Sequence, residues 1–295
     1  MKKLRQLGMG LATVAGLARR GWFIPHRYAQ SLAAPGENPP YAPVAASFAE
    51  RLPRFVDVLE RALALKPALR AIAAESGKPA AGIPGPRFDQ GWFATLDAAA
   101  AYALVRERRP GQIVEVGSGH STRFLARALH DAGSEAGILS IDPQPRASIE
   151  ALAPRVRFER RTVQQVDPAL FQTLRPGDVL FIDSSHILMP GSDCDWLFNR
   201  ILPMLPAGVL VHIHDIFLPD DYPAAWAWRN YNEQQGVAPL LANSWRAVFA
   251  SHYVVRHSPQ EVAALIGDLP KHPAAIPASL WLEKPDADSA PGIAC

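Results

Sequence analysis

The fold is decided by Ile113-Val114-Glu115-Val116-Gly117-Ser118-Gly119-His120-Ser121-Thr122. An apolar, β-branched run ends in two glycines, and hydroxyl residues suited to the start of a helix follow. The glycines allow a tight turn and let a ligand approach the backbone, while the first helical turn offers free N–H groups. An ordinary turn between a strand and a helix also has this pattern, since a single G-x-G is a weak signal.

Short apolar runs alternate with helical stretches on both sides of this segment. Such alternation predicts an α/β fold, a mostly parallel sheet with helices on both faces, whose ligands bind beyond the carboxyl ends of the strands. The predicted strands are residues 113–116, 138–141, 156–158, 179–182 and 209–213, and the predicted helices are 92–108, 122–132, 168–174 and 196–205.

Residues 1–86 have a different pattern and are predicted to form an N-terminal helical segment that ends in a Gly/Pro/Ala-rich linker at 77–86. Residues 87–295 then form the main domain. Ser47-Phe48-Ala49-Glu50 has the spacing of a capping box, which predicts that a helix begins near Ser47. Pro53 is expected to kink or restart that helix.

The overall charge, +2, gives no support for a nucleic-acid partner. Residues 1–30, however, contain six basic residues and no acidic one. They include the apolar run Leu7–Ala18, which is too short to span a bilayer. This leaves an export signal, a helix packed on the protein, or a peripheral helix on a membrane surface. The two cysteines, Cys194 and Cys295, form no disulfide framework and favour a cytoplasmic location.

Two features near the glycines bear on the ligand. The dinucleotide fingerprint G-x-G-x-x-G would need glycine at position 122, where Thr122 stands, and this counts against NAD(P). Asp142 ends the second predicted strand, where a carboxylate can accept both hydroxyls of a ribose. Asp142 thus favours a nucleoside ligand without choosing its class, and a carboxylate that only caps the turn before Pro143 stays open as the alternative.

The segment from Glu115 to Ser121 resembles motif I, E/D-x-G-x-G-x-G, of the class I S-adenosylmethionine (SAM)-dependent methyltransferases. Ser121 stands in place of the third glycine. In that family the loop backbone holds the methionine part of SAM, and the acid is linked to it. The resemblance implies that SAM is the cofactor and that its binding residues are Glu115, Gly117, Ser118, Gly119, Ser121, Thr122 and Asp142.

Polar residues follow two later strands: Asp183 and His186 after one, His214 and Asp215 after the other. If these strands are neighbours, the four side chains converge, and they could take the proton of a substrate hydroxyl or bind a divalent cation. The pattern resembles that of sugar and natural-product O-methyltransferases, some of which use Mg²⁺. This implies a metal site of Asp183, His214 and Asp215, although His214 replaces an acid and weakens it. A metal-free acid–base site and a purely structural network both stay open.

The resemblance covers residues 20–284 and implies a Rossmann-like sheet of seven strands, closed by an antiparallel pair at 247–249 and 279–282. Tyr222, Trp226, Trp228 and Tyr231 form either an aromatic lid over a substrate or a packing or dimer contact. Residues 88–93 could line the site as well.

We therefore predict a SAM-dependent methyltransferase (EC 2.1.1.-) that O-methylates a small molecule or a saccharide. Two alternatives remain: an NAD(P)-dependent oxidoreductase, and a SAM-binding protein without catalysis. A homodimer and a membrane contact through residues 1–30 stay open as partners.

Overall fold

The structure is a computed structural model that describes residues 2–75, 85–145, 152–242 and 245–286. Most of the predicted linker at 77–86, and Cys295, lie outside these residues. The chain forms two compact units. The smaller unit is Met1–Pro39 with Asp221–Asn230, and the larger unit is Pro40–Asp220 with Tyr231–Cys295. The chain passes between the two units after Pro39, Asp220 and Asn230, and the division predicted after residue 86 stays a prediction.

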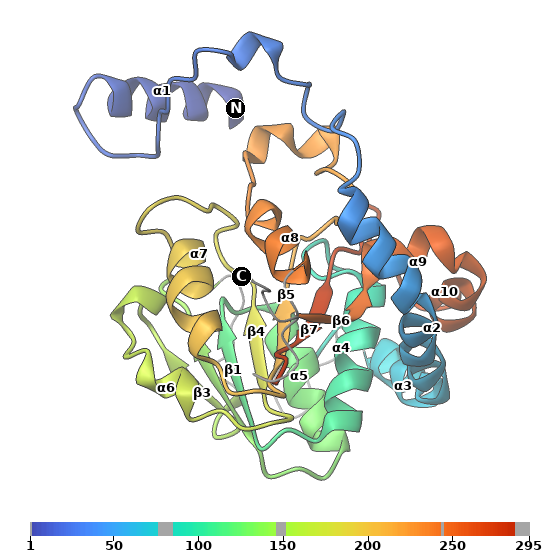
Figure 1. Cartoon of the computed structure of the whole chain (residues 1–295). Coiled ribbons are helices and arrows are strands. Elements are labelled where there is room, and N and C mark those ends of the chain that lie inside the picture. The colour runs from blue at the N-terminus through green and yellow to red at the C-terminus, as the bar shows by residue number, and fades with distance from the viewer. Residues whose placement is uncertain (1, 76–84, 146–151, 243–244, 287–295) are drawn as a thin grey trace, which may run out of the picture. The chain divides into compact units, whose positions relative to one another are not determined.

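A seven-stranded sheet is the centre of the larger unit (Figure 1). Its order is β3-β2-β1-β4-β5-β7-β6, and β7 runs antiparallel to both of its neighbours. All five predicted parallel strands and the closing antiparallel pair are confirmed. The strands are β1 (Gln112–Val116), β2 (Gly137–Ile141), β3 (Val156–Glu159), β4 (Val179–Ile182), β5 (Leu210–Ile213), β6 (Arg246–Ala250) and β7 (Leu280–Glu283).

Helices lie on both sides of this sheet, as predicted, with α4 and α5 on one side and α6 and α7 on the other (Figure 1). The helices of the larger unit are α2 (Ala42–Ala64), α3 (Lys66–Glu75), α4 (Thr95–Arg108), α5 (His120–Asp131), α6 (Ala169–Gln172), α7 (Asp193–Trp196), α8 (Gln234–Ala242), α9 (Ser251–His257) and α10 (Pro259–Ile266). A π-helical turn (Leu197–Ile201) and a 3-10 turn (Leu202–Met204) extend α7, and a further 3-10 turn covers Val163–Gln165.

Helix α4 is buried on nearly every side. Its side chains from Thr95 to Val105 are all buried, because it is covered by the sheet, α5, α2 and α10. Four consecutive alanines, residues 98–101, allow these close approaches. A helix that is apolar all round belongs in the interior, and an acid within it, Asp97, therefore needs a partner.

Helix α2 differs from its prediction in where it begins and in how it passes Pro53. It begins at Ala42 with Pro43 in the first turn, so Ser47 lies inside the helix and caps nothing. Proline is well tolerated in a first turn, where its missing N–H would have no partner. The helix also continues through Pro53. Its apolar side chains pack on the larger unit, with Phe48 against Tyr253 and Phe55 against Phe249. This packing offsets the hydrogen bond that Pro53 removes.

The smaller unit contains α1 (Lys2–Val14) and two 3-10 turns, Ala29–Ser31 and Ala224–Arg229. Its two chain segments are joined by hydrogen bonds: the Gly36 N–H and the Asn38 amide both donate to the Asp221 carboxylate. No helix in the described part of the chain is both long and apolar enough to cross a membrane.

Candidate functional site

The predicted site residues meet at the carboxyl edge of the sheet, because the backbone ladder continues past each strand. The Gly117 N–H donates to the Ile141 carbonyl at 2.9 Å, and the Asp183 N–H donates to the Val116 carbonyl at 2.8 Å. The His214 N–H donates to the Ile182 carbonyl at 3.0 Å. β2 pairs with one side of β1 and β4 with the other, so the strand order switches at β1. The site lies at this switch point, where open α/β sheets bind ligands.

The two glycines after β1 have different surroundings. Gly117 has φ +85°, and a Cβ atom there would lie 1.9 Å from the backbone carbonyl oxygen of Asp183. Only glycine fits this position. A Cβ atom on Gly119 would meet open space. The loop is therefore pressed against β4 at Gly117 and leaves room for a ligand at Gly119.

The Glu115 side chain stabilises this loop through hydrogen bonds. Its fully buried carboxylate accepts hydrogen bonds from the hydroxyls of Ser121 at 2.9 Å, Thr122 at 2.7 Å and Ser140 at 3.0 Å. Burial raises the pKa of Glu115 to about 8, although the three hydroxyls counteract the rise. The Thr122 hydroxyl also accepts from the Gly119 N–H. The side chains of Glu115, Ser121 and Thr122 are thus directed at the loop itself.

Asp142 lies beside the same loop. One of its carboxylate oxygens accepts from both the N–H and the hydroxyl of Ser118, each at 2.9 Å. The other accepts from the Gln144 N–H at 2.7 Å. The tip of β2 is therefore connected directly to the loop after β1.

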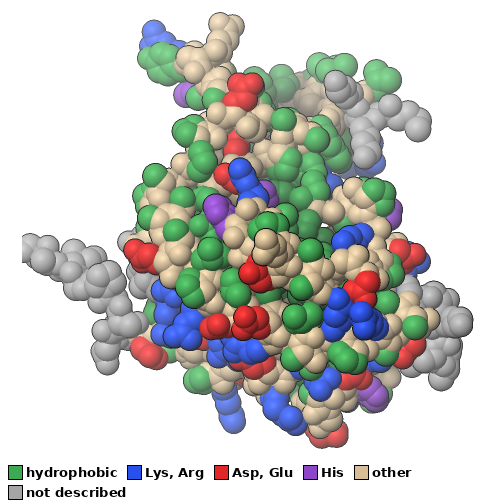
Figure 2. All heavy atoms as spheres, turned by 90° about the vertical axis from the view of Figure 1, so that its right-hand side faces the viewer, with side chains coloured by type: hydrophobic (Ala, Val, Ile, Leu, Met, Phe, Trp, Pro, Cys, Tyr) green, Lys and Arg blue, Asp and Glu red, His purple; other side chains and the backbone are tan. Residues whose placement is uncertain are grey.

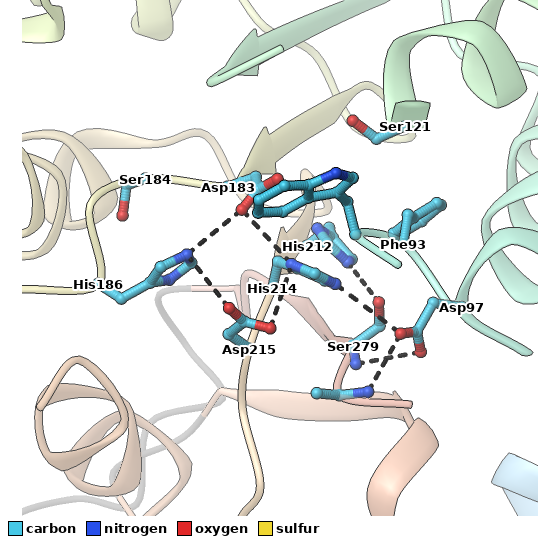
Figure 3. A network of polar contacts seen from close by, with 12 residues as sticks. Phe93, Asp97, Ser121, Asp183, Ser184, His186, His212, His214, Asp215 and Ser279 are labelled. Carbon is cyan, nitrogen blue, oxygen red and sulfur yellow. Dashed lines mark hydrogen bonds and ion pairs between the residues drawn. The ribbon is translucent and has the colours of Figure 1, made fainter. Parts of the chain in front are cut away.

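The four predicted catalytic residues come together in one cluster, shown in Figure 3. His186 Nε2 lies 3.4 Å from both Asp183 Oδ1 and Asp215 Oδ2. His214 Nδ1 lies 3.4 Å from Asp183 Oδ1 and 3.5 Å from Asp215 Oδ1. The Asp183 side chain is 31% exposed, against 5% for each histidine and 10% for Asp215. Asp183 is thus the member that a substrate can touch.

Two buried acids complete the cluster and were not among the predicted site residues. Glu233 accepts from the Ser184 hydroxyl at 3.0 Å and lies 2.8 Å from His186 Nδ1. Asp97 accepts from the N–H groups of Ala278 and Ser279 and lies 3.8 Å from His214 Nε2. The signal for Asp97 was an acid within the apolar stretch 96–105 of α4.

The charges of the cluster follow from its contacts. Burial alone would lower the pKa of each histidine, but the surrounding carboxylates outweigh it and hold the pKa values of His186 and His214 well above their usual range. Burial would likewise raise the pKa of Asp183, yet the two histidines hold it well below its ordinary value. Asp183 is therefore ionised, and both histidines are protonated.

The metal site predicted from Asp183, His214 and Asp215 stays a prediction. The three side chains lie together, with His214 Nδ1 3.4 Å from Asp183 Oδ1 and 3.5 Å from Asp215 Oδ1. Among the described residues, no group of three or more His, Cys, Asp or Glu side chains is placed to hold a metal ion. His186, proposed from sequence as a base, is almost fully buried, and the carboxylates around it hold its pKa well above the usual range.

Aromatic rings pack against both histidines. Phe93 lies 5.5 Å from His214 and Tyr231 lies 4.5 Å from His186, measured between ring centroids. The Gln90 side chain fixes the turn before Phe93 by accepting from the N–H groups of Trp92 and Phe93. Tyr222, Trp226 and Trp228 belong to the smaller unit, so the predicted lid stays a prediction.

His186 and Asp215 both have left-handed backbones, with φ of +62° and +57°. Non-glycine residues seldom adopt this conformation, which costs of order 1 kcal/mol or more and persists where contacts enforce it. Here the ion pairs and the Glu233 contact supply that enforcement.

The strand order, with a loop of two glycines after β1, an acid at the tip of β2 and an antiparallel β7, is that of the class I SAM-dependent methyltransferases. The sequence agrees: residues 114–216 match a family described as a methyltransferase domain. The matched segment runs from β1 through the residues after β5 and contains the whole candidate site except Asp97 and Glu233. The chain thus contains a methyltransferase domain with the class I strand order.

Solved structures with partial likeness include three of different kinds. A methyltransferase of Podospora anserina bound to SAH is 16% identical, with 90% of this chain and 100% of that chain covered and a TM-score of 0.36. An O-methyltransferase of Bacillus cereus in complex with SAH is 16% identical, with coverages of 62% and 83% and a TM-score of 0.35. The branched-chain polyamine synthase of Thermus thermophilus is 16% identical, with coverages of 76% and 65% and a TM-score of 0.42. No curated protein matches the sequence.

Proposed function

We propose that this methyltransferase moves the methyl group of SAM to a hydroxyl oxygen of a small acceptor, a saccharide included. One observation carries the proposal. The backbone of Asp183 touches the loop at Gly117, while the carboxylate of Asp183 is the exposed member of a buried charged cluster. A group that can receive a hydroxyl proton is thus built directly beside the loop suited to the methyl donor.

The backbone from Gly117 to Gly119 would hold the methionine part of SAM, with the open side of Gly119 as the approach. Asp142 would accept the ribose hydroxyls. Glu115, Ser121 and Thr122 would keep the loop in shape, because their side chains bond to one another. When bound, SAM supplies a methyl group on a positively charged sulfur, ready for attack by a nucleophile.

On the acceptor side, Asp183 would accept a hydrogen bond from the hydroxyl and orient one oxygen lone pair toward the methyl group. The proton would pass to Asp183 as the new O–C bond forms. His186 and His214 would act as positioning residues that keep Asp183 ionised and fixed, and Glu233 and Asp97 would hold the two histidines in turn. Most of the rate enhancement would come from this alignment.

A hydroxyl fits the accessible part of this cluster, because Asp183 is its exposed carboxylate and is held in place by His186 and His214. A neutral hydroxyl needs only one fixed hydrogen-bond acceptor. A cytoplasmic location also belongs to this proposal, since SAM is an intracellular metabolite.

Calorimetric titration with SAM tests the cofactor half of the proposal. We expect binding that Asp142→Ala weakens by about 1–3 kcal/mol, the usual size for hydrogen bonds to a charged group. Asp167→Ala removes an exposed carboxylate at the start of α6 and serves as the matched control. Binding of NAD⁺ instead of SAM would overturn the assignment.

Transfer of a labelled methyl group from SAM to a panel of hydroxylated small molecules and sugars tests the other half. The expected product is an O-methyl ether that forms equally well in EDTA. Products methylated on nitrogen alone would contradict the choice of oxygen. Tight SAM binding without any turnover would favour the non-catalytic alternative.

A further inference from the structure

The smaller unit carries a large apolar surface that nothing in the described chain covers. Among the described residues, twelve of the eighteen exposed large hydrophobic side chains belong to it, although it holds 49 of the 295 residues of the chain. Single exposed hydrophobic residues are normal on a protein surface, but a concentration of this kind marks a surface that binds something apolar.

Helix α1 presents part of this surface as one stripe. Leu4, Leu7, Leu11 and Val14 are spaced by three, four and three residues, so they share one face of the helix, and each is at least 60% exposed. Gln6 lies outside this stripe, and its amide donates to the Trp228 carbonyl. The helix thus turns its apolar stripe outward, the reverse of an ordinary surface helix.

The chain after α1 extends the apolar surface with aromatic residues. Trp22, Phe23, Ile24, Tyr28 and Leu32 are all exposed, by 46% to 67%. Tryptophan and tyrosine favour the boundary between lipid and water, because each has an apolar ring and a polar group.

The net charge of the smaller unit indicates which kind of apolar partner it would bind. It contains seven basic and two acidic residues and so carries +5, which leaves −3 for the larger unit. The Arg20 N–H donates to the Thr13 hydroxyl, which fixes Arg19 and Arg20 next to the end of α1. In contrast, the α2–α3 face of the larger unit mixes charges of both signs, as Figure 2 shows, with ion pairs such as Arg70–Asp268.

We propose that the smaller unit docks on an anionic lipid bilayer. The α1 stripe and the aromatic residues 22–28 would lie among the upper acyl chains, with Arg5, Arg19 and Arg20 against the headgroups. An exposed apolar stripe beside basic residues, in a helix too short to span a membrane, is the pattern of helices that lie in the interface. A second copy of the chain would bring the same +5 charge to the contact, which disfavours a dimer through this surface.

Co-sedimentation of the full chain with vesicles tests the proposal. Vesicles of phosphatidylcholine and phosphatidylglycerol in equal parts are compared with vesicles of phosphatidylcholine alone. We expect binding at least about tenfold tighter to the anionic vesicles, and weaker at high salt. The triple variant Arg5→Gln, Arg19→Gln, Arg20→Gln should lose roughly a hundredfold, since each charge near such a surface contributes about fivefold.

The matched control is Arg54→Gln, Arg70→Gln, Arg157→Gln, which removes the same charge from exposed positions of the larger unit. Its affinity for the vesicles should stay within about twofold of the wild type. Equal losses in the two triple variants, or equal binding to both kinds of vesicle, would overturn the proposal.

A second measurement addresses the apolar stripe. Leu4→Ser, Leu7→Ser, Leu11→Ser should abolish vesicle binding and leave SAM binding unchanged. Tryptophan fluorescence should shift to the blue on addition of anionic vesicles, and Trp22→Phe should remove most of that shift. Should the wild type instead sediment as a dimer that these serines dissociate, without binding vesicles, a second copy covers the stripe and the proposal is wrong.

Discussion

The backbone carbonyl of Asp183 stands 1.9 Å from the point that a Cβ atom on Gly117 would occupy. The loop suited to the methyl donor and the carboxylate suited to the acceptor are thus built on touching main chains, at the tips of β1 and β4. The separation of these two main chains does not depend on any side-chain rotamer. Because methyl transfer depends on alignment of two reactants, fixing this separation in the backbone is a direct contribution to the rate.

Gly117→Ala should therefore destabilise the fold severely. The new methyl group would meet backbone atoms that cannot rotate away, and alanine at φ +85° is strained in any case. We expect a loss of at least about 3 kcal/mol in the free energy of unfolding. Urea denaturation followed by circular dichroism measures it.

Gly119→Ala provides the control at the neighbouring glycine. Its Cβ atom would meet open space, so the free energy of unfolding should change by less than about 1 kcal/mol. If SAM occupies that space, the same variant should bind SAM at least about tenfold more weakly. Equal destabilisation by the two alanines would contradict the contact described between Gly117 and Asp183.

Asp183→Asn should abolish turnover and leave SAM binding nearly intact. An amide cannot take the proton of the acceptor hydroxyl, and loss of a positioned base usually costs about 10²–10⁴ in rate. Steady-state kinetics and SAM calorimetry separate the two effects. Asp167→Asn, the same change at an exposed carboxylate, should keep the wild-type rate. Full activity of Asp183→Asn would end the proposed role.

Most strands were predictable from sequence because they are short apolar runs, β-branched or aromatic, that are buried on both faces, whereas the edge strand β3 is buried only in part. The five parallel strands match their predictions to within one residue at either end. Helix α2 shows where local signals mislead. The capping-box spacing at Ser47 predicted a helix start there, yet the helix begins at Ala42 with Pro43 in its first turn. Pro53 does not break the helix, because the packing of Phe48 and Phe55 offsets its cost.

The site was predictable only in part. Residues just after a strand could be placed at the edge of the sheet, and this located Asp142, Asp183 and His214. Asp97 comes from a helix and Glu233 from the segment before α8, so no rule about strand ends points to them. The protonation states of the histidines could not be predicted either. That of His186, for example, depends on three carboxylates from different parts of the chain, Asp183, Asp215 and Glu233.

Glu115→Gln should flatten the dependence of stability on pH. The native pKa of Glu115, about 8, lies above its usual value of 4.5, so the native state binds a proton that the unfolded state releases. The resulting stabilisation is complete below pH 4.5 and is lost as the pH rises through 8, by up to about 1.4 kcal/mol per unit. Urea midpoints of both proteins at pH 5, 6, 7 and 8 test this. The glutamine resembles the neutral acid and should show a shallower decline, and parallel curves would refute the assignment.

Three neighbouring histidines should have pKa values shifted in opposite directions from the usual value. His186 and His214, with carboxylates around them, should stay protonated above pH 7, whereas burial holds the pKa of His212 well below its usual range. NMR titration of the imidazole protons reads each separately. Asp183→Asn removes the anion that His186 and His214 share, so both of their pKa values should fall, while His212, hydrogen-bonded to Ser279, should stay neutral.

The raised pKa values of His186 and His214 also stabilise the fold, in full below pH 6.5 and progressively less as the pH passes the native values. If His186 and His214 were neutral at pH 7 in the wild type, the charged cluster proposed to hold Asp183 would not exist.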